Sequence, residues 1–328
     1  MSTKKKQALK VKALLWEKGQ RALELAKQTV KQEKIPSEPI QQALEYFIDS
    51  WKDVVHPASL ALSCEAVGGK AEETTQIGVA FVLLAGGADI HDDIIDESTF
   101  KYSKKTVLGK FGKDIAILAG DALLFKGLYV LHEACEALPM NQKRLVLEST
   151  MQAFFGISSA EAMESNLKAS GSIVAEEYLS MIKTKAAVAE ATMRIGAIIG
   201  GGSLEEIEAL ASFGKTFGTL LTIRDEFIDV FELNEIKNRA KREWLPLPIL
   251  YTFKDTAKKE EILSLLKGDP ITKKAVERTL EIVIASKETQ ELKCEMYSMI
   301  EEENQRLSLI KKNQDKFKLM LKAIVEDF

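Results

Sequence analysis

The chain has 328 residues, 46% of them hydrophobic, which is enough apolar surface for a large core in one domain or two small ones. Its formal net charge is −4 and its charged residues are dispersed, so we expect no nucleic-acid partner. Cys64, Cys135 and Cys294 lie far apart without metal-ligand spacing, which argues against a disulfide framework and favours a cytoplasmic location. No apolar run approaches the ~18 residues of a membrane span, so the sequence predicts no transmembrane segment.

The distribution of prolines predicts an all-α fold. Only seven prolines occur, and they leave two long intervals without a helix breaker. In 178–200, alanines and large apolar residues recur every three or four positions, and three glycines follow at 200–202, which predicts a buried helix with a C-terminal cap. Strand signals are poor throughout. The polar, basic-leaning stretch 232–243 is interpreted as a loop or an exposed helix end.

The apolar segment 79–96 ends in a first acidic motif. Asp92, Asp93 and Asp96 are close in sequence, and Asp92 and Asp96 share a helix face because they are four residues apart. Such carboxylates repel one another unless a cation lies among them, and Mg²⁺ commonly joins one or two carboxylates to substrate phosphates. The motif therefore predicts a magnesium site for a phosphorylated ligand, with a solvated acidic helix end as the alternative.

The segment 213–231 carries a second acidic motif with the same spacing. Its acids are Asp225, Glu226 and Asp229. Two helices with matched carboxylate faces can hold metal ions between them inside a helical bundle. A di-iron centre would need two Glu-x-x-His pairs, and the three histidines are not placed to make them. Ligation by oxygen atoms alone, and hence Mg²⁺, is favoured.

With these motifs the chain resembles the polyprenyl synthetase, or trans-isoprenyl diphosphate synthase, family. The segment 91–98, HDDIIDES, resembles the first aspartate-rich motif of the family, and 225–229 resembles the second, with Glu226 in place of the commoner aspartate. The helix 178–185 resembles one that ends in a diphosphate-contacting lysine, here Lys185. Further segments similar to the family are 64–69, 111–124 and 245–251.

The resemblance implies a single domain over 1–328, an isoprenoid-synthase-type helical bundle around a central cavity, and a homodimer. Asp92 and Asp96 would bind Mg²⁺, with Asp93 beside them, and Asp225, Glu226 and Asp229 would complete the metal site. Lys185 would help to neutralise the leaving diphosphate. By this resemblance the catalytic residues are Asp92, Asp96, Lys185 and Asp225, and the substrate is an allylic prenyl diphosphate whose C–O bond is ionised.

Five further residues are assigned to the substrate. Lys101 is the positive charge that remains where the family usually has an Arg-Arg pair after the first motif. Lys241 and Arg242 could reach the diphosphate from the loop after the second motif, although a basic loop can also be merely solvated. Gly87 precedes Asp92 by about one turn, as does Ala88, so these small residues suggest room for a long prenyl chain, with close helix packing as the equal alternative. The roles of Asp89 and Glu161 are left open.

The cations that the family uses for isopentenyl diphosphate are absent from their expected place. The corresponding run is 51–57, WKDVVHP, where Asp53, Val54 and His56 stand in place of a lysine and two arginines. A diphosphate needs clustered cations with several donors, so these replacements argue against ordinary chain elongation.

Three functions remain open on the sequence. The first is a magnesium-dependent prenyltransferase that passes the prenyl group to an acceptor. The second is a class I terpene synthase-like enzyme that uses one prenyl diphosphate. The third is a non-catalytic or regulatory subunit that forms a heteromer with an active synthase. Retention of both acidic motifs speaks against the third, because a decayed site has little reason to keep repelling carboxylates.

Overall fold

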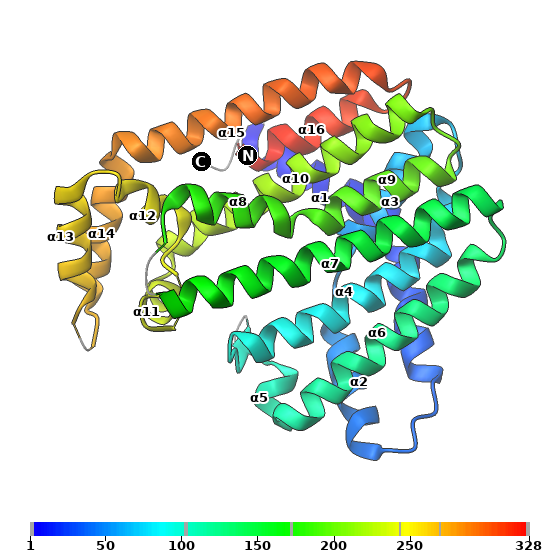
Figure 1. Ribbon diagram of the computed structural model, residues 1–328, viewed down its shortest axis with the longest axis horizontal. Helices are drawn as coiled ribbons and strands as arrows, with labels where there is room; N and C mark the ends of the chain where they lie inside the picture. Colours follow the sequence, from blue (N-terminus) through cyan, green and yellow to red (C-terminus); the bar gives the residue numbers. More distant parts are fainter. Residues whose placement is uncertain (1–2, 102–103, 171–172, 243, 269, 326–328) are drawn as a thin grey trace.

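The computed structural model describes residues 3–101, 104–170, 173–242, 244–268 and 270–325. These parts of the chain are almost entirely helical, as predicted from the prolines and the apolar periodicity (Figure 1). The first half consists of α1 (Thr3–Gln32), α2 (Glu38–Ser50), α3 (Val55–Val67), the 3-10 turn η1 (Ala71–Thr74), α4 (Thr75–Ile95), α5 (Val107–Phe111), α6 (Lys113–Cys135) and α7 (Met140–Ser170).

The second half is helical as well. It consists of α8 (Ala175–Lys185), α9 (Ala187–Ile199), α10 (Leu204–Phe231), α11 (Leu233–Arg242), α12 (Leu247–Thr252), α13 (Thr256–Leu266), α14 (Lys273–Ala285), α15 (Lys287–Arg306), the 3-10 turn η2 (Leu307–Leu309) and α16 (Gln314–Val325). The two strands described, β1 (Phe100–Lys101) and β2 (Lys104–Lys105), pair antiparallel in one short hairpin directly after α4.

Helix α4 carries the first acidic motif and lies in the interior of the bundle. Residues 77–84 are all buried, and they pack against α1, α3 and α6. Burying a large apolar side chain stabilises the fold by roughly 1.5–3 kcal/mol, so this run fixes the position of the helix firmly. The acidic residues follow on its last turns, where the burial becomes partial. The apolar run therefore holds the carboxylates at a defined place at the end of a rigid helix.

Helix α10 carries the second motif and joins two parts of the core. Phe213, Phe217, Leu220 and Phe227 belong to the largest hydrophobic cluster, which includes side chains of α1, α3, α8, α12, α15 and α16. Val230, at the end of the same helix, packs instead in a smaller cluster formed with α11–α14. In Figure 1 the α11–α14 group lies at one end of the molecule, and α10 extends toward it from the bundle.

The segment predicted as one helix over 178–200 forms two helices. The chain breaks between α8 and α9 at Ala186, which has φ −70° and ψ 1° and caps the end of α8. The break leaves Lys185 at the last position of α8, with its side chain at the cavity described below. The predicted cap after the segment is present, since Gly201 adopts a left-handed φ of 74°. The stretch 232–243, interpreted as a loop or exposed end, is largely the separate helix α11.

Helix α6 is the one described helix that is long and apolar enough to cross a membrane, judged by length and composition alone. It packs along α4, and 33% of its most apolar window is buried. The same composition occurs in core helices of soluble proteins, so the prediction of no transmembrane segment stays a prediction.

Candidate functional site

A cavity of about 1130 Å³ lies between the helices that carry the two acidic motifs. Helix α4 contributes Ala85, Ala88, Asp89 and Asp93 to its wall, and α10 contributes Phe217, Gly218, Leu221 and Thr222. Lys185 enters from the end of α8. A neighbouring cavity of about 540 Å³ is lined by Asp92, Glu161, Ala88 and Asp89 among others. The two cavities share residues, so they form one continuous site region beside the first motif.

Lys101, on strand β1, lies against the first acidic motif. Its Nζ atom lies 2.8 Å from Oδ1 of Asp93 and 3.0 Å from Oδ1 of Asp89. The distance from the same nitrogen to Oδ2 of Asp92 is 3.9 Å. Lys101 thus bridges three acidic side chains, and Asp89, whose role the sequence left open, is one of its partners.

Two carboxylates of the first motif, Asp92 and Asp93, have raised pKa values. Burial raises the pKa of Asp92 to about 7, and the nearby Asp96 adds to the effect. Burial also raises the pKa of Asp93 to about 6, although Lys101 opposes it. Crowded, partly desolvated carboxylates of this kind favour a cation among them. The donor set consists of oxygen atoms, which fits Mg²⁺.

Lys185 is enclosed by two glutamates of α7. Its Nζ atom lies 2.8 Å from Oε1 of Glu161 and 2.6 Å from Oε2 of Glu164. Burial lowers the pKa of Lys185, but the two carboxylates outweigh burial and hold that pKa above its usual value. The side chain is charged at neutral pH and partly shielded from solvent, so it is suited to meet an anion. Glu161, which the sequence also left open, acts as one of its partners.

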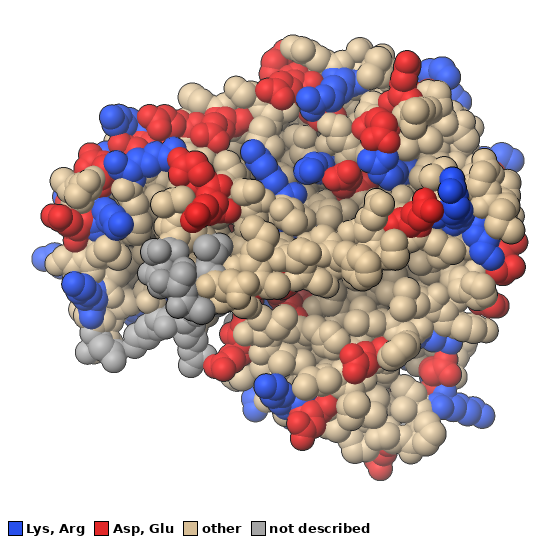
Figure 2. All heavy atoms as spheres, viewed as in Figure 1, with Lys and Arg blue, Asp and Glu red and all other residues tan. Residues whose placement is uncertain are grey.

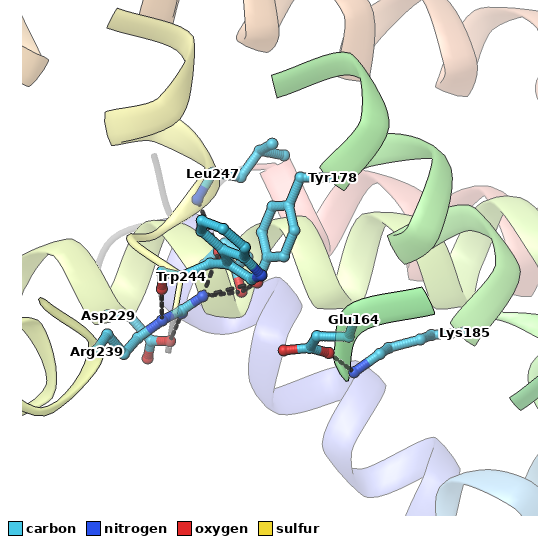
Figure 3. Close-up of polar contacts among 8 residues, drawn as sticks. Glu164, Tyr178, Lys185, Asp229, Arg239, Trp244 and Leu247 are labelled. Atoms are coloured by element: carbon cyan, nitrogen blue, oxygen red, sulfur yellow. Dashed lines mark hydrogen bonds and ion pairs between the residues drawn. The ribbon is translucent and has the colours of Figure 1, made fainter. Parts of the chain in front are cut away.

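The second acidic motif is arranged differently from the first (Figure 3). Glu226 is buried and accepts hydrogen bonds from the Tyr178 hydroxyl, at 3.1 Å, and from the Leu247 backbone N–H, at 2.7 Å. Asp229 lies 2.6 Å from Nη1 of Arg239, a residue of α11. Asp225 forms no ion pair with any residue that the structure describes, and burial raises its pKa. Two of the three acids are therefore engaged within the chain.

The two acidic motifs differ in how well their residues fit a metal ion. Among the described residues, no three His, Cys, Asp or Glu side chains come together as a ready-made metal site. Mg²⁺ in phosphate-binding sites needs only one or two carboxylates, with waters and phosphate oxygens completing its shell. Asp92 and Asp96 satisfy that requirement in number and chemistry, and Asp225, which lines neither cavity, is the acid of the second motif that Arg239 does not engage. Glu226 and Asp229 fit less well, because Arg239 already neutralises them.

The two small residues before the first motif have different surroundings. Ala88 lines both cavities. Gly87 lines neither of them, and a Cβ atom added there would lie 2.8 Å from Cγ of Leu124 and 2.9 Å from the carbonyl oxygen of Gly120. Gly87 therefore allows close packing of α4 against α6, and the room in the cavity is left by Ala85 and Ala88. Lys241 and Arg242 lie at the end of α11, and their side chains fall outside the described part of the structure.

Several cavity residues were not assigned a role from the sequence. Lys52, Lys104 and Lys105 line the larger cavity, the last two from the β1–β2 hairpin. The Lys-Lys pair shortly after the first motif was the available signal. Asp53 accepts backbone N–H bonds from the first turn of α3 and lies 2.7 Å from Nδ1 of His56, which also lines the cavity. Asp53 therefore positions α3 and His56.

The fold and the site together define an isoprenoid-synthase type of protein, in which the two helices that carry the acidic motifs both line one cavity. A family model described as polyprenyl synthetase matches residues 37–283. The chain belongs to the polyprenyl synthetase family. A crystal structure of geranylgeranyl pyrophosphate synthetase from Pyrococcus horikoshii matches with a TM-score of 0.85 and 25% identity, covering 96% of this chain and 98% of that one.

Two curated relatives are similar in sequence. A short chain isoprenyl diphosphate synthase of Methanothermobacter thermautotrophicus is 32% identical over 199 residues, which is 60% of each chain. A geranylgeranyl diphosphate synthase of Methanosarcina mazei is 30% identical over 207 residues, or 62% of this chain and 63% of the relative. The matched region thus spans less than two thirds of these relatives.

Proposed function

We propose that this protein is a magnesium-dependent prenyltransferase that ionises an allylic prenyl diphosphate and transfers the prenyl group to an acceptor. The observation that carries the proposal is the position of the first acidic motif beside a cavity of about 1130 Å³ with apolar walls. Phosphate would be held at the charged mouth, through Mg²⁺ on Asp92, Asp96 and Asp225. The prenyl chain would extend along Ala85, Ala88 and Phe217.

Bound Mg²⁺ would supply Lewis-acid stabilisation of the departing diphosphate. The residues of the chain supply the rest of the chemistry. Lys185 and Lys101 place two positive charges near the same mouth, where a fixed cation stabilises developing negative charge better than mobile water does. Phe154, Phe217 and Leu221 line the cavity and keep water away from an allylic cation.

We infer that the acceptor is a second diphosphate, as in chain elongation. The sequence argued against this because Asp53, Val54 and His56 occupy the expected places of cations. Lys52, Lys104 and Lys105, however, lie on the wall of the same cavity. The names of the two curated relatives also support an elongating synthase. A terpene synthase-like reaction of a single diphosphate is the second candidate, since Trp51, Phe154 and Phe217 would also surround an isolated allylic cation.

We propose a homodimer formed through α6 and α7. Figure 2 shows that this side of the molecule has few charged side chains across its centre. Large apolar residues are exposed on both helices, namely Leu118, Phe125, Leu128 and Tyr129 on α6 and Met140, Met151 and Phe155 on α7. An apolar face of this kind usually marks a protein interface. A second copy of the chain would bury it, and a related synthase subunit is the alternative occupant.

Two further assignments rest on more general features. We propose that 1–328 act as a single domain, because α10 contributes Phe227 to the largest core cluster and Val230 to the cluster with α11–α14. We propose a cytoplasmic location, because Cys64, Cys135 and Cys294 are free thiols.

The metal site can be tested by calorimetric titration of Mg²⁺ and inorganic pyrophosphate into the protein. Asp92→Ala and Asp225→Ala should each weaken Mg²⁺-dependent pyrophosphate binding by at least about tenfold, the usual scale for disturbing a metal site. Asp114→Ala on α6 is a control, because that acid lies outside both cavities. Unchanged binding in both site variants would contradict the proposed metal site.

A further inference from the structure

Arg239 is a buried cation inside the second acidic motif. Arg239 is 4% exposed, and its side chain projects from α11 toward α10 (Figure 3). Nη1 lies 2.6 Å from Oδ2 of Asp229, and Nη2 lies 3.0 and 3.1 Å from the two carboxylate oxygens of Glu226. The guanidinium therefore contacts two of the three acids that were expected to hold metal ions.

The remaining bonds of Arg239 fix its orientation. Nη2 also donates to the Tyr178 hydroxyl at 2.7 Å, and Nε donates to the carbonyl oxygen of Trp244 at 2.8 Å. Figure 3 shows Tyr178, Trp244 and Leu247 converging on this one guanidinium and its acids. The planar fork of an arginine loses little freedom when it forms several bonds at once, so the arrangement is preorganised. It also ties α8, α10, α11 and the start of α12 together.

The carboxylate of Glu226 has little remaining capacity for a metal ion. It receives the Arg239 guanidinium, the Tyr178 hydroxyl and the Leu247 backbone N–H. A metal ion at this point would have to displace a buried arginine and break those bonds, leaving a guanidinium charge without its counterions. Removing one partner of a buried ion pair is strongly unfavourable. Binding of the Arg239 guanidinium at Glu226 is therefore favoured over binding of a Mg²⁺ ion, because Mg²⁺ loses its bound waters reluctantly.

We propose that Arg239 is the resident cation of the second acidic motif, and that Glu226 and Asp229 hold this arginine in place of metal ions. This inference rests on the proposed function, since it divides the roles within that site. Asp225 is then the one acid of the motif that meets a metal–diphosphate complex. Arg239 is a positioning residue, which keeps α11 and the Trp244–Leu247 connection bound to α8 and α10 whether or not metal is bound.

The test counts Mn²⁺ ions bound to the full-length protein by electron paramagnetic resonance, with and without inorganic pyrophosphate. Glu226→Gln and Asp229→Asn should leave the number and affinity of bound Mn²⁺ as in the wild type. Arg239→Gln should create an additional Mn²⁺ site, and the double variant Arg239→Gln/Glu226→Gln should lose that site again. Arg194→Gln is the matched control, because Arg194 pairs with Glu190 and Glu208 away from both cavities.

The outcomes separate this inference from the proposed function. Loss of an ion, or an affinity at least about tenfold weaker, in Glu226→Gln or Asp229→Asn would overturn the role of Arg239. If Asp92→Ala does not change Mn²⁺ binding, the proposed metal site at the first motif is wrong. The role of Arg239 is then judged from Glu226→Gln and Asp229→Asn alone. If Arg239→Gln does not fold, Mn²⁺ binding by Asp229→Asn still tests the inference, because this variant keeps Arg239 paired with Glu226.

Discussion

Lys185, at the last position of α8, lines the larger cavity, and its Nζ atom lies 2.6 Å from Oε2 of Glu164 on α7 (Figure 3). The pair holds a charged lysine in a defined place before any ligand binds. A diphosphate that enters the cavity meets a cation whose side chain is already ordered, so less conformational entropy is lost on binding.

Lys185→Gln should lower kcat/KM for an allylic diphosphate by about 100-fold or more, the scale of removing one fixed group that stabilises developing charge. Lys183→Gln is the matched control, since Lys183 lies two residues earlier on the same helix and is exposed. Steady-state kinetics of pyrophosphate release measures both. Equal, small effects of the two substitutions would contradict a role for Lys185 at the diphosphate.

Two adjacent residues of α4 should respond in different ways to added bulk. Ala88→Phe should reduce the affinity for C15 and C20 diphosphates more than for C5, because Ala88 lines the cavity. Gly87→Ala should leave this preference unchanged and destabilise the fold by about 1–3 kcal/mol, the usual result of overpacking a helix contact. Competition binding and urea denaturation separate the two effects. A changed chain-length preference in Gly87→Ala would show that this residue shapes the cavity.

The sequence was sufficient for the features that depend on local spacing. Asp92 and Asp96 are four residues apart on a helix, so their common face follows from helix geometry alone. Absence of strand patterns and long proline-free intervals likewise predicted the helical fold. Lys185 could be found because it belongs to a contiguous motif, although the break at Ala186 that positions it was not visible in the continuous apolar pattern.

Other features depend on contacts between distant segments. Arg239 lies in a polar stretch that is ordinary in sequence, and its role arises only where α11 packs back onto α10. The surroundings of Gly87 depend on which residues of α6 face it, and these are Gly120 and Leu124. Lys104 and Lys105 reach the cavity only because the hairpin after α4 turns back. Helical periodicity contains no information about these pairings.

The Asp53–His56 pair should make stability depend on pH. Burial lowers the pKa of His56, but Asp53, 2.7 Å away, outweighs burial and raises that pKa above its usual value. Because the folded state favours the imidazolium, the pair stabilises the fold fully below the unfolded pKa of about 6.5 and loses this effect as the pH rises through the folded pKa.

The measurement is the free energy of unfolding of wild type and His56→Gln between about pH 5.5 and pH 8.5. The wild type should be the more stable at the acidic end, and the difference should shrink toward the alkaline end. His132→Gln is the control, because His132 is exposed. A stability difference that grows with rising pH would contradict the assignment.

The exposed apolar face should determine the oligomeric state. Phe125→Glu and Phe155→Glu, on α6 and α7, place charges in the proposed interface and should convert a dimer to monomers in light scattering after size-exclusion chromatography. Ile284→Glu on α14 is exposed but lies elsewhere, so it should leave the mass unchanged. A wild-type protein that is already monomeric would contradict the homodimer and leave a different subunit as the occupant of this face.

The most direct test of the proposed prenyltransferase is an assay of pyrophosphate release and product mass in the presence of Mg²⁺. Allylic diphosphates from C5 to C20 are supplied singly and then together with isopentenyl diphosphate. The predicted result is release only in the paired reactions, with products longer by C5 units and no turnover in Asp92→Ala. Release from a single diphosphate, with a hydrocarbon or alcohol as the product, would contradict elongation and establish the terpene synthase-like reaction instead.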